Sequence, residues 1–408
     1  MKRLLCLPST YLGLPMLLAC GLTLLTYDLP VDYMEGLLLL AVTALAVVLF
    51  DVRSSVRIPE TERFRARHYA GSRDAFVALA FAGLIVLFCL LDLTLFPIPL
   101  FDRPSSYAVM TGGREHVRHI SDMCWVLPPI ALLCARSRWL RNVLIAIGFL
   151  FPVLVIDRNR LFASVFSFAL VILLRRDETR PLPWKSVGFL ALAGGSIFSI
   201  LGILRSGPLD YITLPFSAMY RASPVGIKWL LLYGSAGPYN FSAMLAKHYS
   251  NTSFLINQVV PMSGSVATAG TDIPLDAPTI NVGTEFFPFL LALGPVGAVV
   301  SFFALYGLLR WSVRRLCPTV PLFSLLIFLR VSYVCVMSPF APQAFTWTNV
   351  GFVGLCLFMQ VVAAWLPNRR LQKPTGDRQG DADATALHTM SPTIFPVSTE
   401  PWNKTKFT

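Results

Sequence analysis

Arginine is the residue type whose placement in this sequence most suggests chemistry. Arg158 and Arg160 stand in the four-residue segment that starts at Asp157, between two short apolar runs. A planar guanidinium group matches phosphate oxygens bidentately, so two of them in one turn can bind an anionic ligand. The alternative is a local ion pair with Asp157, and the sequence leaves both open. Arg205 and Arg221, further along the chain, are candidates to join them.

Arg330 is a second unusual cation, because it lies near the middle of an apolar run. A lipid-facing charge at that depth costs at least ~2.5 kcal/mol, so the side chain must face the interior of a helix bundle. One interpretation is a buried ion pair with Asp92, which also lies within an apolar run. The other is the floor of an anion-binding cavity.

Candidates for acid and base chemistry are Glu285, His248, Asp272 and Asp276. Glu285 ranks first because it begins an apolar run, where partial burial would raise its pKa toward that of a useful base. A carboxylate favoured by a helix N-terminus explains its position equally well. His248 is a lone histidine, a residue that usually has no special role. Motifs for zinc proteolysis, ATP hydrolysis and serine hydrolysis are absent from the sequence, and we expect no metal or cofactor.

Composition indicates what positions these residues. Of 408 residues 55% are hydrophobic and only 14% charged, with a mean hydropathy of +0.63. Soluble domains carry about 25% charged residues, so a soluble enzyme is excluded and most of the chain must face lipid. We expect an all-α, polytopic membrane protein. Ten apolar runs are candidate transmembrane helices: 5–26, 34–51, 75–96, 122–135, 142–156, 161–174, 187–204, 286–309, 319–337 and 349–366. The fourth to sixth are short, and the first is expected to be a retained span and no cleaved signal.

The basic residues predict the orientation of these helices. With the N-terminus inside, 24 of the 34 Lys and Arg residues fall on the cytoplasmic side and nine on the other. Because basic residues are retained in the cytoplasm, both termini are expected there. The net charge of +12 is therefore a signal of topology. No nucleic-acid partner is expected, because the basic residues form no basic domain.

The longest extracytoplasmic segment, 205–285, has about 80 residues, too many for a simple connector. Residues 227–233 suit a helix lying in the outer membrane interface, although a missed membrane span is the alternative. Residues 252–278 are rich in Ser, Thr, Gly, Ala and Pro and are expected to be extended or loop-like. Residues 1–367 form the predicted transmembrane domain, and the polar tail 368–408 is expected to be cytoplasmic and disordered.

Several of these features together resemble the bacterial O-antigen and oligosaccharide repeat-unit polymerases, called Wzy. The resemblance covers roughly residues 140 to 340 and rests on the order of four local features. The first two are a basic turn at 157–160 and a span ending in Ile203-Leu204-Arg205-Ser206-Gly207. The other two are the large loop with Tyr233-Gly234-Ser235-Ala236-Gly237-Pro238-Tyr239-Asn240, and the start of the next span at Asn281-Val282-Gly283-Thr284-Glu285, followed by Gly294-Pro295-Val296-Gly297.

The resemblance implies a glycosyltransferase of the bacterial inner membrane. Such an enzyme polymerises undecaprenyl-pyrophosphate-linked oligosaccharide units at the periplasmic face, in lipopolysaccharide biosynthesis. It moves the growing glycan to a sugar hydroxyl on an incoming lipid-linked unit, and the family usually works with a flippase and a Wzz-type chain-length regulator. The implied catalytic residues are Glu285, His248 and Arg205. The implied pyrophosphate- and glycan-binding residues are Arg158, Arg160, Arg205, Arg221, Arg330, Tyr239 and Asn281.

Two other functions remain open at this point. An O-antigen ligase shares the topology and the donor but uses lipid A core as the acceptor. A transporter or flippase would distribute polar residues through several spans, whereas here only Asp92 and Arg330 lie firmly within apolar runs.

Overall fold

The computed structural model describes residues 5–54, 56–59, 64, 69–102, 113–176, 183–206, 209, 212–260 and 273–367. The chain divides into two units, Met1–Leu366 and Pro367–Thr408. The tail that we expect to be disordered therefore lies outside the described residues. Within the described part of the first unit there is no strand, and the only β-type pairing is a single bridge between Tyr27 and Phe216. The expected all-α fold is confirmed.

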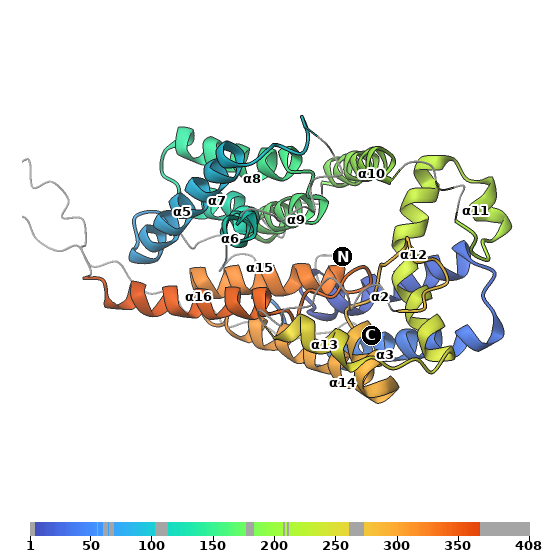
Figure 1. The fold of residues 1–408 in the computed structure, drawn as a ribbon. Helices are drawn as coiled ribbons and strands as arrows, with labels where there is room; N and C mark the ends of the chain where they lie inside the picture. The colour runs from blue at the N-terminus through green and yellow to red at the C-terminus, as the bar shows by residue number, and fades with distance from the viewer. Residues whose placement is uncertain are drawn as a thin grey trace, which may run out of the picture. The chain divides into compact units, whose positions relative to one another are not determined.

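Each of the ten apolar runs coincides with helical structure (Figure 1). Regular hydrogen bonding within each segment is what an apolar stretch requires where water cannot satisfy its backbone. The helices that match the runs are α2 (Ser9–Thr26), α3 (Met34–Arg53), α5 (Arg73–Leu95), η3 (Asp122–Val126) with α7 (Leu127–Cys134), α8 (Arg138–Leu154), α9 (Arg158–Arg175), α10 (Trp184–Ser206), α14 (Phe287–Arg314), α15 (Leu322–Met337) and α16 (Trp347–Trp365).

Among the described residues, five helical segments are long and apolar enough to cross a membrane. They are Ser9–Thr26, Val31–Arg53, which joins the short η1 (Val31–Tyr33) to α3, Arg73–Leu95, Phe287–Arg314 and Trp347–Trp365. The apolar helix α15 is shorter, with 16 residues, and most of its residues are buried. It packs against α2, α9, α14 and α16.

The segment 205–285 was expected as one large loop. After the end of α10, its described residues include three helices: α11 (Ala218–Ala222), α12 (Val225–Ala246) and α13 (Thr252–Val259). The expected helix at 227–233 is present, but it is the first part of α12, which packs on α2, α3 and α10. The second half of α12 is almost wholly buried. The expectation of an extended chain is wrong for residues 252–259, and residues 261–272 lie outside the described part.

Close packing of α12 depends on its small residues. A Cβ atom on Gly237 would lie 1.9 Å from the carbonyl oxygen of Pro339, so only glycine permits this approach. The segment that follows α15 therefore runs directly against α12.

A second glycine, Gly294, has φ +70° and breaks the helical path within α14 just before Pro295.

Candidate active site

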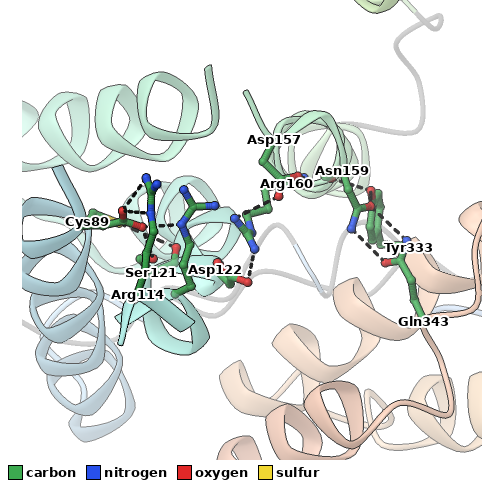
Figure 2. A network of polar contacts seen from close by, with 11 residues as sticks. Cys89, Arg114, Ser121, Asp122, Asp157, Asn159, Arg160, Tyr333 and Gln343 are labelled. Atoms are coloured by element: carbon green, nitrogen blue, oxygen red, sulfur yellow. Dashed lines mark hydrogen bonds and ion pairs between the residues drawn. The ribbon is translucent and has the colours of Figure 1, made fainter. Parts of the chain in front are cut away.

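The basic turn at 157–160 is the N-terminus of α9. The side chain of Asp157 accepts a hydrogen bond from the backbone N–H of Arg160 at 3.0 Å, which caps the helix. The same carboxylate forms an ion pair with the Arg160 side chain at 3.0 Å, and Arg160 also pairs with Asp122 of η3 (Figure 2). For Arg160 the local ion pair is therefore present. The guanidinium group is 13% exposed.

A second Asp–Arg cluster lies beside the first. Asp92 of α5 is fully buried and pairs with two arginines one turn apart on α6 (Arg114–Ser121). The distances from its carboxylate are 3.1 Å to Arg114 and 2.6 Å to Arg118. The suggested ion pair between Asp92 and Arg330 is wrong, because both carboxylate oxygens of Asp92 are bonded to the arginines of α6.

Arg330 occupies a different place. Its Nε donates to the side-chain oxygen of Asn349 at 3.0 Å, and its guanidinium carbon lies 5.7 Å from the ring centre of Trp125 and 5.9 Å from that of Tyr333. Among the described residues, no carboxylate forms an ion pair with Arg330 within 4.0 Å. A cation held by an amide and two aromatic faces keeps its charge available to a ligand.

Arg330 and Arg160 line one pocket of about 320 Å³. The elements that form its wall are α6, η3, the start of α9, α15 and the first turns of α16. The pocket combines two arginines with amides, hydroxyls and aromatic rings, which is a lining suited to a polar ligand with a negative charge. Besides the two arginines, the lining includes His119, Asp122, Trp125, Asn159, Gln343, Thr346, Trp347, Thr348 and Phe352.

Asn159 and Gln343 connect α9 to the segment after α15. The Asn159 side-chain oxygen accepts from Gln343 Nε2 at 3.1 Å and from the Tyr333 hydroxyl at 2.5 Å (Figure 2). The Tyr333 hydroxyl also lies 2.7 Å from the backbone oxygen of Asn159. These contacts hold the N-terminus of α9 against α15, beside the pocket.

Glu285 does not have the role of a free base. It is 1% exposed, and its carboxylate accepts backbone N–H groups from Gln343 at 2.5 Å, Ala344 at 2.9 Å and Phe345 at 3.3 Å. Burial raises the pKa of Glu285 to about 7, although the three N–H groups and the charge of Arg330 favour the ionised form. Glu285 directly precedes the N-cap of α14, as the alternative of a helix N-terminal carboxylate expects, but the N–H groups that it accepts belong to the segment between α15 and α16. Glu285 positions the segment that carries Gln343.

Arg158, the other arginine of the turn, points to a different pocket. Its guanidinium carbon lies 5.2 Å from the ring centre of Tyr233 on α12. It lines a second pocket, of about 740 Å³, together with residues of α9, α10 and α12. The two arginines of the turn thus diverge from a common helix end.

The structure does not bring Arg221, His248 or Asn281 to the first pocket. Arg221 is exposed and lies 3.7 Å from Asp28, also exposed. His248 and Asn281 are exposed and line neither pocket. The backbone of Arg205 lies in the last turn of α10, whereas its side chain, and all of Asp272, lie outside the described residues.

Tyr239, expected to bind glycan, is buried and bonded elsewhere. Its hydroxyl donates to Asp276 at 2.8 Å, as does the hydroxyl of Tyr33, and Lys247 pairs with the same carboxylate at 2.6 Å. Although burial opposes the charge, the hydrogen bonds from Lys247 and the two tyrosines lower the pKa of Asp276. This group joins α12 to the segment before α14 and is a structural contact.

Sequence reasoning missed several residues of the pocket. His119 lies against Trp347, with ring centres 4.9 Å apart and planes at 78°. Arg114 and Arg118, which pair with Asp92 and do not line the pocket, carried a signal in the sequence, since their i,i+4 spacing places them on one helix face. His119, Trp347 and Gln343 belong to no motif, and only the packing of α6 near the start of α16 assembles them.

The described residues contain no group of three or more His, Cys, Asp or Glu side chains that could hold a metal ion. Comparisons with protein-family models, with curated proteins and with solved structures find no match for this chain.

Proposed function

We propose that this protein is a membrane glycosyltransferase that polymerises undecaprenyl-pyrophosphate-linked oligosaccharide units at the periplasmic face of a bacterial inner membrane. The observation that carries the proposal is Arg330, a cation within an apolar helix that lines a pocket with Arg160 and has no carboxylate ion pair among the described residues. A charge in such a position is costly and is retained for function.

The charges around the pocket support an anionic ligand. Arg114 and Arg118 share Asp92, and Arg160 pairs with Asp122 and Asp157, so three arginines and three aspartates balance. Arg330 is the cation left over. Glu285 is close enough to influence it, but both carboxylate oxygens of Glu285 are bonded to backbone N–H groups. A pyrophosphate would pair directly with Arg330, which has no carboxylate within 4.0 Å among the described residues.

The proposed reaction is transfer of the growing glycan between two lipid-linked molecules. The bond from the anomeric carbon to the pyrophosphate oxygen breaks, and its electron pair passes to the pyrophosphate. The hydroxyl oxygen of the incoming unit forms the new bond to that carbon and gives its proton to a base. Arg330, assisted by Arg160, stabilises the charge that develops on the leaving pyrophosphate. The faces of Trp125 and Trp347 offer apolar surfaces for sugar rings.

We assign the base to His119 in this proposal. The two bases expected from the sequence are less suitable, since Glu285 is occupied by three N–H groups and His248 lines neither pocket. The imidazole of His119 lines the pocket together with Arg330 and is exposed to it. A base must come within hydrogen-bond reach of the attacking hydroxyl, and His119 is the titratable side chain of this lining able to accept a proton without breaking an ion pair.

The test uses a bacterial strain in which the gene is deleted and replaced by variants. Arg330→Ala and Arg330→Lys are expected to abolish long glycan chains while the protein still reaches the membrane. Lysine keeps the charge but loses the planar Nε contact to Asn349. Arg221→Ala is the matched control, because Arg221 is exposed and lines neither pocket. Normal chain lengths in the Arg330→Ala variant would contradict the proposal.

The deletion strain itself separates polymerase from ligase. Loss of a polymerase leaves lipid A core carrying one repeat unit, whereas loss of an O-antigen ligase leaves bare core. Elongation of lipid-linked units by the purified protein in detergent would exclude transport as its main function, since detergent provides no sealed compartment. If a Wzz-type regulator is a partner, its removal should change chain length without abolishing polymerisation.

A further inference from the structure

The second pocket is larger than the first, and fewer polar side chains line it. Its volume is about 740 Å³, within the range of roughly 300 to 1,000 Å³ typical of small-molecule sites. Most of its wall is apolar, with Phe162 of α9, Leu230 of α12 and Phe340 after α15. The cation at this pocket is Arg158, whose guanidinium group lies over the ring of Tyr233.

Two glycines of α10 line the second pocket and leave space in it because they have no side chain. A Cβ atom on Gly194 would find only a ring carbon of Phe162 at 4.0 Å, and one on Gly195 would meet Leu230 at 3.6 Å. Both positions thus accept a side chain at ordinary contact distance, and their lack of one leaves space. An elongated apolar ligand with an anionic end matches this combination of apolar walls and one arginine.

The two pockets share a wall. Asn159 and Gln343 line both of them and are hydrogen-bonded to each other. The pair is held from behind by the Tyr333 hydroxyl, which donates to Asn159, and by Glu285, which accepts the backbone N–H of Gln343. Two ligands bound in the two pockets would therefore approach each other across one amide pair.

We propose that the second pocket binds the lipid end of the second lipid-linked molecule in the transfer, that is, its first isoprene units and the phosphate of the pyrophosphate that is bonded to them. Arg158 holds the phosphate, the walls of α9, α10 and α12 hold the first isoprene units, and the Asn159–Gln343 pair lies where the two substrates meet. This inference rests on the proposed function, which supplies the reason for two lipid-linked ligands. It adds a site and a role for Arg158 that are separate from those of Arg330.

The direct test measures binding to the purified full-length protein in detergent. The probe is farnesyl phosphate, with farnesol and inorganic phosphate as comparison ligands in calorimetric titration. Farnesyl phosphate should bind most tightly, because only it combines an apolar chain with the anionic end. Arg158→Met removes the charge but keeps an unbranched apolar chain, and it should weaken farnesyl phosphate binding by about tenfold or more.

A second variant tests the apolar part of the site without touching a charge. Gly195→Leu places a side chain in the pocket and should also weaken farnesyl phosphate binding. Gly188→Leu is its matched control, because Gly188 lies on the same helix and a Cβ atom there meets nothing within 4 Å. Leucine favours helix over glycine at both positions, so the comparison isolates the filled space.

Each outcome decides the inference separately from the proposed function. Equal binding by wild type, Arg158→Met and Gly195→Leu would overturn the second site, even if Arg330→Ala abolishes polymerisation. Inorganic phosphate binding as tightly as farnesyl phosphate would overturn the lipid as its ligand. Farnesyl phosphate binding that depends on Arg158 and Gly195 supports the site. If the purified protein then polymerised no lipid-linked units, the proposed function would be wrong, whereas the proposal of a lipid-phosphate site would still hold.

Discussion

Glu285 accepts the backbone N–H of Gln343 at 2.5 Å, and this contact ties the segment before α14 to the segment after α15. The backbone N–H of Glu285 donates in return to the carbonyl oxygen of Ser338 at 2.7 Å. The two segments are thus cross-linked on both sides of Gln343. Because Gln343 lines both pockets, the position of one buried carboxylate sets the geometry of their shared wall.

The pKa of Glu285 makes this contact sensitive to pH. Burial raises the pKa from 4.5 to about 7, so between these two values the native state binds more protons than the unfolded chain. The free energy of unfolding contributed by this group therefore decreases as pH rises from 4.5 to 7 and changes little above that. Glu285→Gln cannot ionise. We expect the thermal midpoint of the wild type to fall more steeply over this interval than that of Glu285→Gln, measured in detergent.

The same variant tests the positioning role. Glutamine offers one acceptor oxygen in place of two and turns an amide donor toward the N–H groups of residues 343–345. We expect polymerisation by Glu285→Gln to fall at least tenfold with the protein still folded and in the membrane. Wild-type activity should also fall below pH 7, where the carboxyl group gains a proton. Parallel pH profiles of activity in the two proteins would contradict this role.

His119 can be tested against a neighbour on its own helix. His119→Gln should lower the polymerisation rate by roughly 10²- to 10⁴-fold, the usual contribution of general base catalysis, with binding of the lipid-linked unit retained. His116→Gln is the matched control, since His116 also lies on α6 but is 73% exposed and lines neither pocket. His248→Gln should likewise have wild-type activity. A loss of similar size in the His116 and His119 variants would exclude a catalytic role for His119.

Asp92 is expected to be a determinant of stability. Replacing Asp92 with Asn leaves Arg114 and Arg118 buried without their shared counterion, which typically costs about 3 to 5 kcal/mol. The expected result is a large decrease in the free energy of unfolding, measured by denaturant unfolding of the purified variant. Asp28→Asn is the control. Its pair with Arg221 is exposed on both sides, and such pairs contribute about 0 to 1 kcal/mol.

Features of the structure that depend only on residues close together in the chain could be predicted from the sequence. Each apolar run became helical because a long apolar stretch satisfies its backbone in that way. Arg330 was expected to face the interior because its charge is costly in lipid, and it lines a pocket. The capping role of Asp157 was not recognised, although a helix start after an aspartate is a common pattern.

Other parts depend on contacts between distant segments. The partners of Glu285 lie 58 to 60 residues away, so no local pattern indicates that its oxygens are occupied. Arg330 was the only partner expected for Asp92, and the packing of α6 against α5 brings Arg114 and Arg118 to it instead. Only residues 227–233 of α12 were expected to be helical, because small and polar residues lower the hydropathy of the rest of this helix. Burial against α2 and α3 explains those residues.

The approach of α12 to the segment after α15 gives a further test, through Gly237. A Cβ atom there would lie 1.9 Å from the Pro339 carbonyl oxygen, so Gly237→Ala must displace the backbone that leads to Gln343. We expect a loss of about 1 to 3 kcal/mol in stability, typical of overpacking, and a clear loss of polymerisation.

Gly226→Ala is the matched control for Gly237→Ala. Gly226 lies on the same helix, but its Cβ would meet Ser199 at 3.7 Å, an ordinary contact. Alanine is favoured over glycine by up to ~1 kcal/mol within a helix at both positions, so propensity alone predicts that both variants are stabilised. A lower stability of Gly237→Ala together with a higher stability of Gly226→Ala would show that the approach to Pro339 is the decisive contact. A stabilised, fully active Gly237→Ala would mean that the wall between the pockets does not depend on α12.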